Sequence, residues 1–431
     1  MRTGTRDYLR GALWVYPSVA VVVALAAGSV LSRITLPAGS WLNPLLFQGT
    51  AGDARSLLLG ISGTMITVIA LVLGLTLVAL QLASTQYSPR LLRSFLRDRP
   101  NQLALSVFVA TFVYSTAGLY TVGVHHQLRT TSYPRLAVTL AIGLLVASLV
   151  VLVYFVHHVA HSIQIDEVMT RVERTTLRVI EQVLPTTDIS AEAPEPPVWA
   201  VPVPAGRSGY LQTVHAVELL AVAHEQDAVV SVVPMLGEHV IQGEPLVRVW
   251  RASPEQPPPR VPSMAGAVRL SLRLGFERTA EQDVAFGVRQ LTDVAVKALS
   301  PAINDPYTAV QALDHTSVLL CALASRPLGH HLLRDLEGEL RVVVRGGDLR
   351  YYLDLAIGQI RRYGATEPRV LRALLRALRS TGSFCLDDAG RALVAEQVRL
   401  VVEAARSAVV QPEDLEQVTV HAEAVLREVS G

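Results

Sequence analysis

Long apolar runs set the first third of the chain apart from the remainder. Four of them are long enough to cross a bilayer, which takes about 20 apolar residues in a helix. Their cores contain no Asp, Glu, Lys or Arg, and they run from about 12–31, 57–82, 103–124 and 136–156. The pattern therefore predicts a transmembrane domain with four helical spans within residues 1–162.

The pattern changes after the last apolar run. Residues 163–184 keep a helical spacing of apolar positions, which predicts a helix that leaves the membrane. A Pro-rich, acidic stretch follows, and such sequences form extended, semi-rigid segments. We therefore assign 163–207 to a connecting helix and linker.

Short alternating runs then replace the helical spacing. Runs at 209–214, 228–233 and 245–250, separated by turn residues, predict β-strands, so 208–260 is expected to form a small β sandwich-like module. After a second Pro-rich break, helical spacing returns, and 261–431 is expected to be a mainly helical domain. The predicted fold class is a membrane α-helical protein with an additional α+β region.

Composition supports a membrane protein. The 431 residues are 50% hydrophobic and only 17% charged, whereas soluble domains carry about 25% charged residues. This composition excludes a disordered chain and argues against one large water-soluble domain. The 38 basic and 37 acidic residues balance each other, so no nucleic-acid partner is expected.

Arginines in the loops indicate the orientation of the spans. Cytoplasmic loops are enriched in Lys and Arg. Arginine is concentrated in the N-terminal tail and in the loop between the second and third spans, at Arg2, Arg6, Arg10, Arg90, Arg93, Arg97 and Arg99. We expect a multi-pass protein of the inner (plasma) membrane, in contact with the lipid bilayer, with both termini in the cytoplasm.

The second span carries small and polar residues at heptad spacing. Such a period keeps side chains on one helix face. The two interleaved series are Gly60, Thr67, Gly74, Gln81 and Ser88, and Gly63, Ala70 and Ser84. A face of this kind allows close packing between helices in lipid, or it lines a narrow polar path. Both interpretations remain open.

The loop after this span gives a second candidate site. Pro89 ends or kinks the helix, and four arginines follow among apolar residues, at Arg90, Arg93, Arg97 and Arg99. They are expected to contact anionic headgroups at the cytoplasmic surface. A ring of arginines at a pore mouth is the alternative if the protein oligomerises around the second span.

The densest polar sequence lies between Glu277 and Asp314. Thr279 and Gln282 match a capping box, which predicts a helix beginning at Ala280. Along that helix, Arg289, Asp293 and Lys297 are four residues apart, so Asp293 can pair with either cation.

This helix is expected to stop at Ser300–Pro301. Asp305 is a predicted N-cap and Pro306 a predicted first residue of the next helix. Two interpretations of residues 277–314 remain open. The first is two helices joined by a rigid turn. The second is a ligand or subunit-contact site, with a polar pocket formed by Arg278, Asp283, Asn304 and Asp305.

Three sequence segments resemble one family. The runs LVALQLASTQYSPRLL, RTAEQD–FGVRQL–ALSPAINDPYTA and SGYLQTV–GEHVIQGEPLVRV resemble an uncharacterised bacterial family of predicted membrane proteins, domain of unknown function 2254. The resemblance covers nearly the whole chain and is most specific in ALSPAINDPYTA. It implies the four-span layout with a cytoplasmic C-terminal region, and no established activity.

No sequence motif indicates catalysis. Walker A, GxSxG and strand-linked GxGxxG motifs are absent, and the two cysteines have no metal-site spacing. His157 and His161 are four residues apart, but no HExxH motif is completed. We expect no enzyme activity, no metal and no cofactor.

Two functions fit these features. The first is a homo-oligomeric ion channel or transport protein whose C-terminal region forms a cytoplasmic vestibule or gate. The second is a membrane-anchored sensor or scaffold whose cytoplasmic domain binds a ligand or a partner protein. The absence of charged residues inside the spans disfavours a proton-coupled pump, which normally places an acidic residue at membrane depth.

Overall fold

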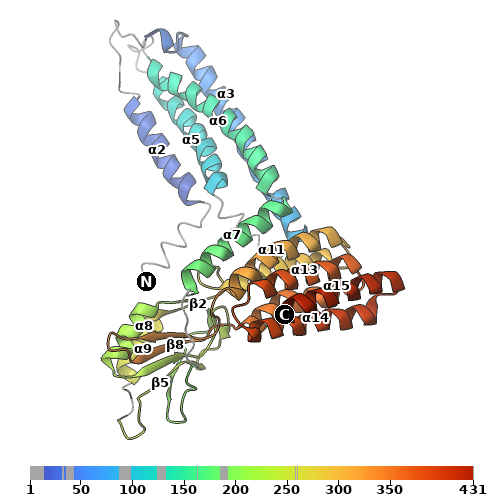
Figure 1. The fold of residues 1–431 in the computed structure, drawn as a ribbon. Coiled ribbons are helices and arrows are strands. Elements are labelled where there is room, and N and C mark those ends of the chain that lie inside the picture. The colour runs from blue at the N-terminus through green and yellow to red at the C-terminus, as the bar shows by residue number, and fades with distance from the viewer. Residues whose placement is uncertain are drawn as a thin grey trace. The chain divides into compact units, whose positions relative to one another are not determined.

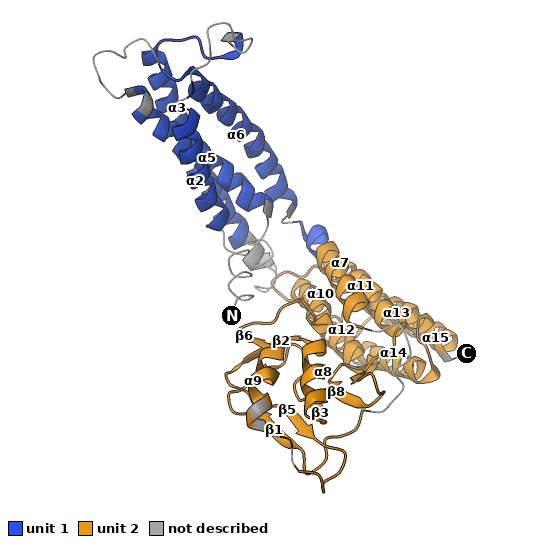
Figure 2. Cartoon of the chain, turned by 90° about the vertical axis from the view of Figure 1, so that its left-hand side faces the viewer, with its two compact units in different colours: residues 1–168 blue, residues 169–431 orange. Residues whose placement is uncertain are grey.

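The chain is mostly helical and divides into two compact units. The computed structural model describes residues 14–31, 34, 43–86, 99–123, 133–162, 164–184, 193–257, 259 and 261–430. Clustering of contacts assigns residues 1–168 to unit 1 and residues 169–431 to unit 2 (Figure 2). The two units are treated separately below.

Unit 1 is a bundle of apolar helices (Figure 1). Its α-helices are α2 (Val15–Leu31), α3 (Ala51–Gln86), α5 (Arg99–Gly123) and α6 (Arg135–Ser162). Three of them contain segments long and apolar enough to cross a membrane, at Ala51–Gln81, Pro100–Tyr120 and Arg135–His161. Helix α2 is equally apolar but has 17 residues, fewer than the about 20 that a span needs.

Helix α5 lies at the centre of this bundle. It packs against α2, α3 and α6, and its Phe108 and Tyr114 are fully buried. The hydroxyls of Thr111 and Ser148 form a hydrogen bond of 2.9 Å between α5 and α6. The Tyr114 hydroxyl donates to the carbonyl of Ala137 at 3.0 Å. These bonds satisfy polar groups that would be costly in an apolar interior.

Helix α7 (Ile165–Val183) lies where the sequence predicts a connecting helix, and it packs within unit 2 from residue 169 onward. The Oε2 atom of Glu173 is 2.6 Å from Nδ1 of His315 on α11 (Pro306–Ala324). The guanidinium of Arg326 donates to the carbonyl of Leu184 at 2.7 Å, just past the helix end. The connecting helix is thus anchored at both its middle and its C-terminus.

Unit 2 contains two β-sheets. A five-stranded sheet has the order β1-β5-β3-β8-β7 and a three-stranded antiparallel sheet the order β4-β2-β6. The strands are β1 (Val201–Pro204), β2 (Gly209–Val214), β3 (Val229–Val232), β4 (His239–Val240), β5 (Pro245–Trp250), β6 (Leu272–Gly275), β7 (His331–Arg334) and β8 (Leu340–Val344). The three strands expected from alternation correspond to β2, β3 and β5.

The two sheets share one apolar core with helices α8 (Ala216–Glu225) and α9 (Val261–Ser271). Fully buried members include Leu211 of β2, Leu219 of α8 and Val247 of β5. The sheets take strands from a longer stretch than the expected 208–260, because β1, β6, β7 and β8 lie outside it.

A layer of helices completes unit 2. It consists of α10 (Val284–Ala298), α11, α12 (Leu349–Tyr363), α13 (Pro368–Ser383), α14 (Asp388–Ala408) and α15 (Pro412–Ser430). Figures 1 and 2 both show α11, α13 and α15 side by side. Helix α13 buries nearly all of its apolar positions, including Leu371, Leu374 and Leu378, between its neighbours.

The contact between α7 and α10 depends on Gly287. A Cβ atom at this position would overlap the side chain of Thr176, which is itself buried and β-branched and so cannot turn away. Gly287→Ala is expected to lower the free energy of unfolding by about 1–3 kcal/mol through overpacking. Thermal unfolding of the full chain in detergent, followed by circular dichroism, measures the change.

Two further variants test this explanation. In a Thr176→Gly background, the cost of Gly287→Ala should shrink because the overlapping atoms are gone. Gly266→Ala on α9 is a matched control, since a Cβ there meets nothing within 4 Å. An equal cost at both glycines would contradict the proposed overlap.

Candidate functional site

The small and polar face of α3 points away from the other described helices of unit 1. Gly60, Gly63, Thr67, Ala70, Gly74 and Gln81 are all exposed. The buried positions of this helix are different residues, among them Leu58, Met65 and Val72. Successive helical residues advance by about 100°. Gly63 and Met65, like Gly74 and Val72, are therefore about 200° apart, on opposite faces of α3.

The exposed face, which we call the α3 face, is smooth and has few free polar groups. A Cβ atom built on Gly60, Gly63 or Gly74 meets nothing within 4 Å. The Thr64 hydroxyl donates to the carbonyl of Gly60 at 2.8 Å, within the same helix. The small residues are therefore not needed for packing inside this chain, and the face can be approached closely by another helix.

Several predicted residues near this face cannot be placed. Ser84 lies in α3 and Arg99 is the first residue of α5, but the side chains of both residues are outside the described part of the structure. Ser88 and three arginines lie outside the described residues, at Arg90, Arg93 and Arg97. Their roles at a pore mouth or at lipid headgroups remain predictions.

In unit 2 the structure brings Arg278 and Asp283 together. The Nε and Nη2 atoms of Arg278 donate to the two carboxylate oxygens of Asp283 at 2.9 and 3.0 Å. The Asp283 side chain is only 2% exposed, and it also caps α10 by accepting from the Phe286 N–H at 2.9 Å. Burial raises the pKa of the Asp283 carboxyl, and the adjacent guanidinium opposes this effect.

The backbone at Gly237 closes over this ion pair. Gly237 has a φ of +81°, in the left-handed region that favours glycine. A Cβ atom there would overlap both the Asp283 carboxylate and the Arg278 guanidinium. The guanidinium carbon of Arg278 also lies 5.6 Å from the centre of the Phe286 ring. The pair is thus enclosed, which indicates a structural clamp between the β3–β4 turn and α10.

The predicted capping box at Thr279 and Gln282 is wrong. Helix α10 begins at Val284 with Asp283 as its cap, four residues later than expected. The Gln282 side chain instead accepts from the Val214 N–H at 2.8 Å and donates to the Val214 carbonyl at 3.3 Å. This long-range amide contact extends the edge of β2 and competes with the local cap.

The remaining polar residues of α10 are partly buried along its length. Arg289, Asp293 and Lys297 are all of intermediate exposure. Lys297 also supplies a carbonyl that accepts from the Ser300 hydroxyl at 2.7 Å, where the helix ends. These residues lie along the side of the helix between its two capped ends.

The joint after α10 confirms the predicted caps. Asp305 is the N-cap of α11 and Pro306 its first residue. The Asp305 carboxylate accepts from the Thr308 hydroxyl at 2.6 Å, and this bond lowers the pKa of the carboxyl. Asn304 is exposed and has a φ of +50°, which allows the sharp turn between the helices.

The structure separates the two halves of the expected polar pocket. Arg278 and Asp283 lie at the start of α10, whereas Asn304 and Asp305 follow its end. The intervening helix has 15 residues, which corresponds to about 22 Å. A single small ligand cannot contact both pairs.

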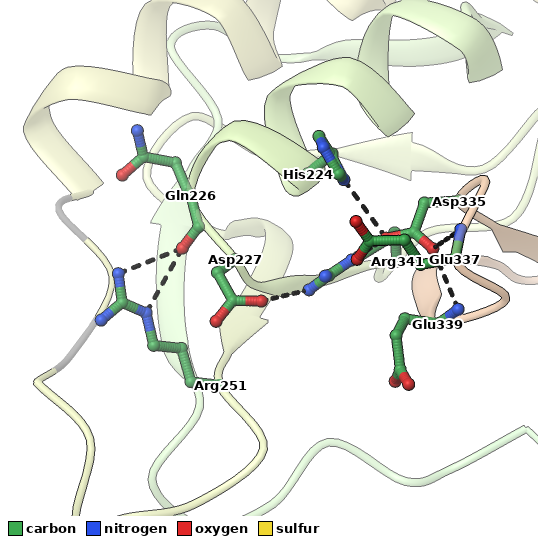
Figure 3. A network of polar contacts seen from close by, with 8 residues as sticks. All are labelled: His224, Gln226, Asp227, Arg251, Asp335, Glu337, Glu339 and Arg341. Atoms are coloured by element: carbon green, nitrogen blue, oxygen red, sulfur yellow. Dashed lines mark hydrogen bonds and ion pairs between the residues drawn. The ribbon is translucent and has the colours of Figure 1, made fainter.

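A polar network in the sheet region had no signal in the sequence. The Asp335 carboxylate accepts from Nε of Arg341 at 2.7 Å, while Nδ1 of His224 lies 3.2 Å away (Figure 3). Arg341 also pairs with Asp227 at 2.7 Å. Arg341 and His224 hold the pKa of Asp335 far below its usual range. These side chains bond to one another, so the network connects the β7–β8 hairpin to the end of α8.

No metal centre is found in the described part of the chain, where no group of three His, Cys, Asp or Glu side chains could hold an ion. The rings of His157 and His161 of α6 lie with their centres 4.1 Å apart and their planes tilted by 43°. Nδ1 of His161 lies 2.9 Å from the carbonyl of His157, so this ring is held by its own helix.

The buried ion pair gives a direct test of the clamp. Asp283→Ala removes the cap of α10 and leaves the Arg278 charge unpaired in the interior. Loss of one partner from a buried pair costs about 3–5 kcal/mol. The thermal unfolding temperature of the full chain should therefore fall by about 6 °C or more. Asp283→Asn keeps a cap acceptor and should cost less, and equal losses would contradict the role of charge.

Comparison with known proteins gives the family of this chain. The sequence profile of the family "Predicted membrane protein (DUF2254)" matches residues 10–380. Uncharacterized proteins of Mycobacterium bovis and Mycobacterium tuberculosis are each 43% identical over 409 residues, which cover 94% of this chain and 78% of theirs. No solved structure matches. The chain is a member of the DUF2254 family of predicted membrane proteins, whose function is unknown.

Proposed function

We propose that this protein is a homo-oligomeric ion channel or transport protein of the bacterial inner membrane, in which neighbouring subunits meet through the α3 face. In this proposal α2 is the fourth span, and both termini lie in the cytoplasm. Unit 2 serves as a cytoplasmic vestibule or gate. The partners are the lipid bilayer, other copies of the chain and the transported ions.

The exposure of the α3 face is the observation that supports this proposal. Small residues on a membrane helix are commonly explained by packing against a neighbouring helix. The buried side of α3 packs through larger residues, such as Leu58 and Met65, so packing within this chain does not account for the small residues. A second copy of the chain is the partner that the proposal assigns to them.

The composition of the spans favours a passive path over an ion pump. The apolar core of α3 contains no Asp, Glu, Lys or Arg, and the same holds for the cores of α5 and α6. Coupled transport of protons normally needs an acidic group at membrane depth. A weakly selective pore needs only small side chains, hydroxyls and backbone carbonyls along its wall.

The alternative function is a membrane-anchored sensor. The residues expected to bind its ligand are instead occupied by structural contacts. Arg278 and Asp283 satisfy each other in an enclosed ion pair. Asp305 is occupied by the cap of α11. The two positions lie at opposite ends of α10.

Cross-linking in the membrane tests the subunit contact. After replacement of Cys321 and Cys385 by serine, Thr67→Cys introduces a single thiol on the α3 face. Oxidation with copper phenanthroline should yield a disulfide-linked dimer of this variant. The matched control is Leu73→Cys, which is exposed on the same helix and lies about 120° away around it. Equal cross-linking at both positions, or none at Thr67→Cys, would refute the proposed contact.

Ion flux tests the pore itself. Purified protein in liposomes or planar bilayers should conduct ions, and Gly74→Leu or Gln81→Leu should reduce the conductance by about tenfold or more. The reason is that a bulky apolar side chain narrows and dewets a pore. Leu73→Ile lies off the α3 face and should conduct normally. Liposomes that hold assembled oligomers yet carry no current would rule out a channel.

A further inference from the structure

A row of arginines runs along α13 in unit 2. The four residues are three, four and three positions apart, which keeps them on one face of the helix. They are Arg369, Arg372, Arg376 and Arg379. This face lies over the seam where α13 packs between α11 and α15.

The arginines bond alternately to the two neighbouring helices. Arg369 bonds to the Tyr307 hydroxyl of α11, and Arg372 donates to Gln417 of α15 at 2.9 Å. Further along, Arg376 pairs with Asp314 of α11 at 3.0 Å, and Arg379 pairs with Glu428 of α15 at 2.6 Å. The row therefore links the three helices, and its last two members are the ones with acidic partners.

A groove of about 440 Å³ lies over the second half of this row. Its size is that of a site for a small organic molecule, since such sites range from about 300 to 1,000 Å³. Ala377 also lines the groove, together with Ser317, Ser380 and Ser383. The hydroxyls of Ser317 and Ser383 donate to backbone carbonyls of their own helices, so Ser380 supplies the hydroxyl that is available to a ligand. Arg376 and Arg379 line it with side chains that are 52% and 57% exposed.

Positive charge predominates along the row. Asp314 and Glu428 balance Arg376 and Arg379 within the groove, and the remaining formal charge of +2 belongs to Arg369 and Arg372, which bond to neutral partners outside it. His421 of α15 lies near the row. Burial lowers the pKa of His421, and the positive charges of Arg376, Arg379 and Arg372 lower it further, while Glu428 opposes them.

Arg376 and Arg379 each have N–H donors that their carboxylate partners do not use. A guanidinium has five N–H donors, but Asp314 is bonded only through Nη2 of Arg376 and Glu428 only through Nε of Arg379. Among the described residues, the other nitrogens of these two groups have no hydrogen-bond partner. Two guanidinium groups one helical turn apart, beside serine hydroxyls, match the acceptors of a phosphate group.

We propose that this groove binds a small phosphorylated molecule, with its phosphate held between Arg376 and Arg379 and a serine hydroxyl donating to it. The volume beyond the phosphate accommodates an organic part of moderate size. A purely structural role for the arginines explains their carboxylate partners. It does not explain the open groove or the unused donors.

Calorimetric titration of the purified full chain in detergent tests the site. The probes are AMP and glycerol 1-phosphate, each compared with its phosphate-free counterpart, adenosine or glycerol. At least one phosphorylated probe should bind, about tenfold or more tightly than its counterpart, because a charge-assisted contact to phosphate is lost without it. Binding of AMP alone indicates a free nucleotide-like ligand, and binding of glycerol 1-phosphate alone indicates a lipid-headgroup ligand.

Variants show whether binding occurs in the groove. The double variant Arg376→Gln and Arg379→Gln should weaken binding by about tenfold or more. Ser380→Asp, at an exposed position, should do the same by repulsion and serves if the double variant fails to fold. Arg350→Gln is the matched control, since Arg350 pairs with Glu396 outside the groove. No binding of either phosphorylated probe, or an equal loss in the control, would overturn the proposal.

Discussion

The parallel pairing of β3 with β8 holds unit 2 together. Val230, Ser231 and Val232 pair with Val342, Val343 and Val344, although more than a hundred residues separate the two strands. The chain builds α10 and α11 between them and then returns to the sheet. Because β8 lies beside β3 in the apolar core of the sheets, the chain must return from α11 to the sheet before it continues into α12. The residue stretches that resembled separate modules in the sequence therefore form one compact unit.

Sequence patterns within a few neighbouring residues predicted the helices and strands that are determined by those same residues. Strands β2 and β5 occur where short runs between turn residues placed them, although both strands are buried at most positions and not only on one face. Asp305 and Pro306 begin α11 because a cap and a proline act within one helical turn. Long apolar runs likewise located the helices of the membrane unit, three of which are long enough to span the membrane.

Long-range contacts decided the features that the sequence did not reveal. Gln282 satisfies the backbone of Val214 across 68 residues, so helix α10 starts later than its capping box suggested. The network of Asp335, Arg341 and His224 joins a hairpin to a helix more than a hundred positions away. The direction of the α3 face was also undetermined, because heptad spacing shows which residues share a face but not what that face contacts.

The family profile and the folded unit end at different places in this chain. The family profile stops at residue 380, inside α13, whereas the fold continues through α14 and α15. Val418, Ala422 and Val425 of α15 are fully buried, so protein cut at the profile boundary would lose the apolar contacts of α15 with α13 and leave its arginine row unscreened on one side. Such a fragment would expose an apolar surface beside arginines that have lost their partners on α15. The residues after the profile boundary therefore belong to the folded unit, and the similarity to the mycobacterial proteins, which covers 94% of this chain, extends into them as well.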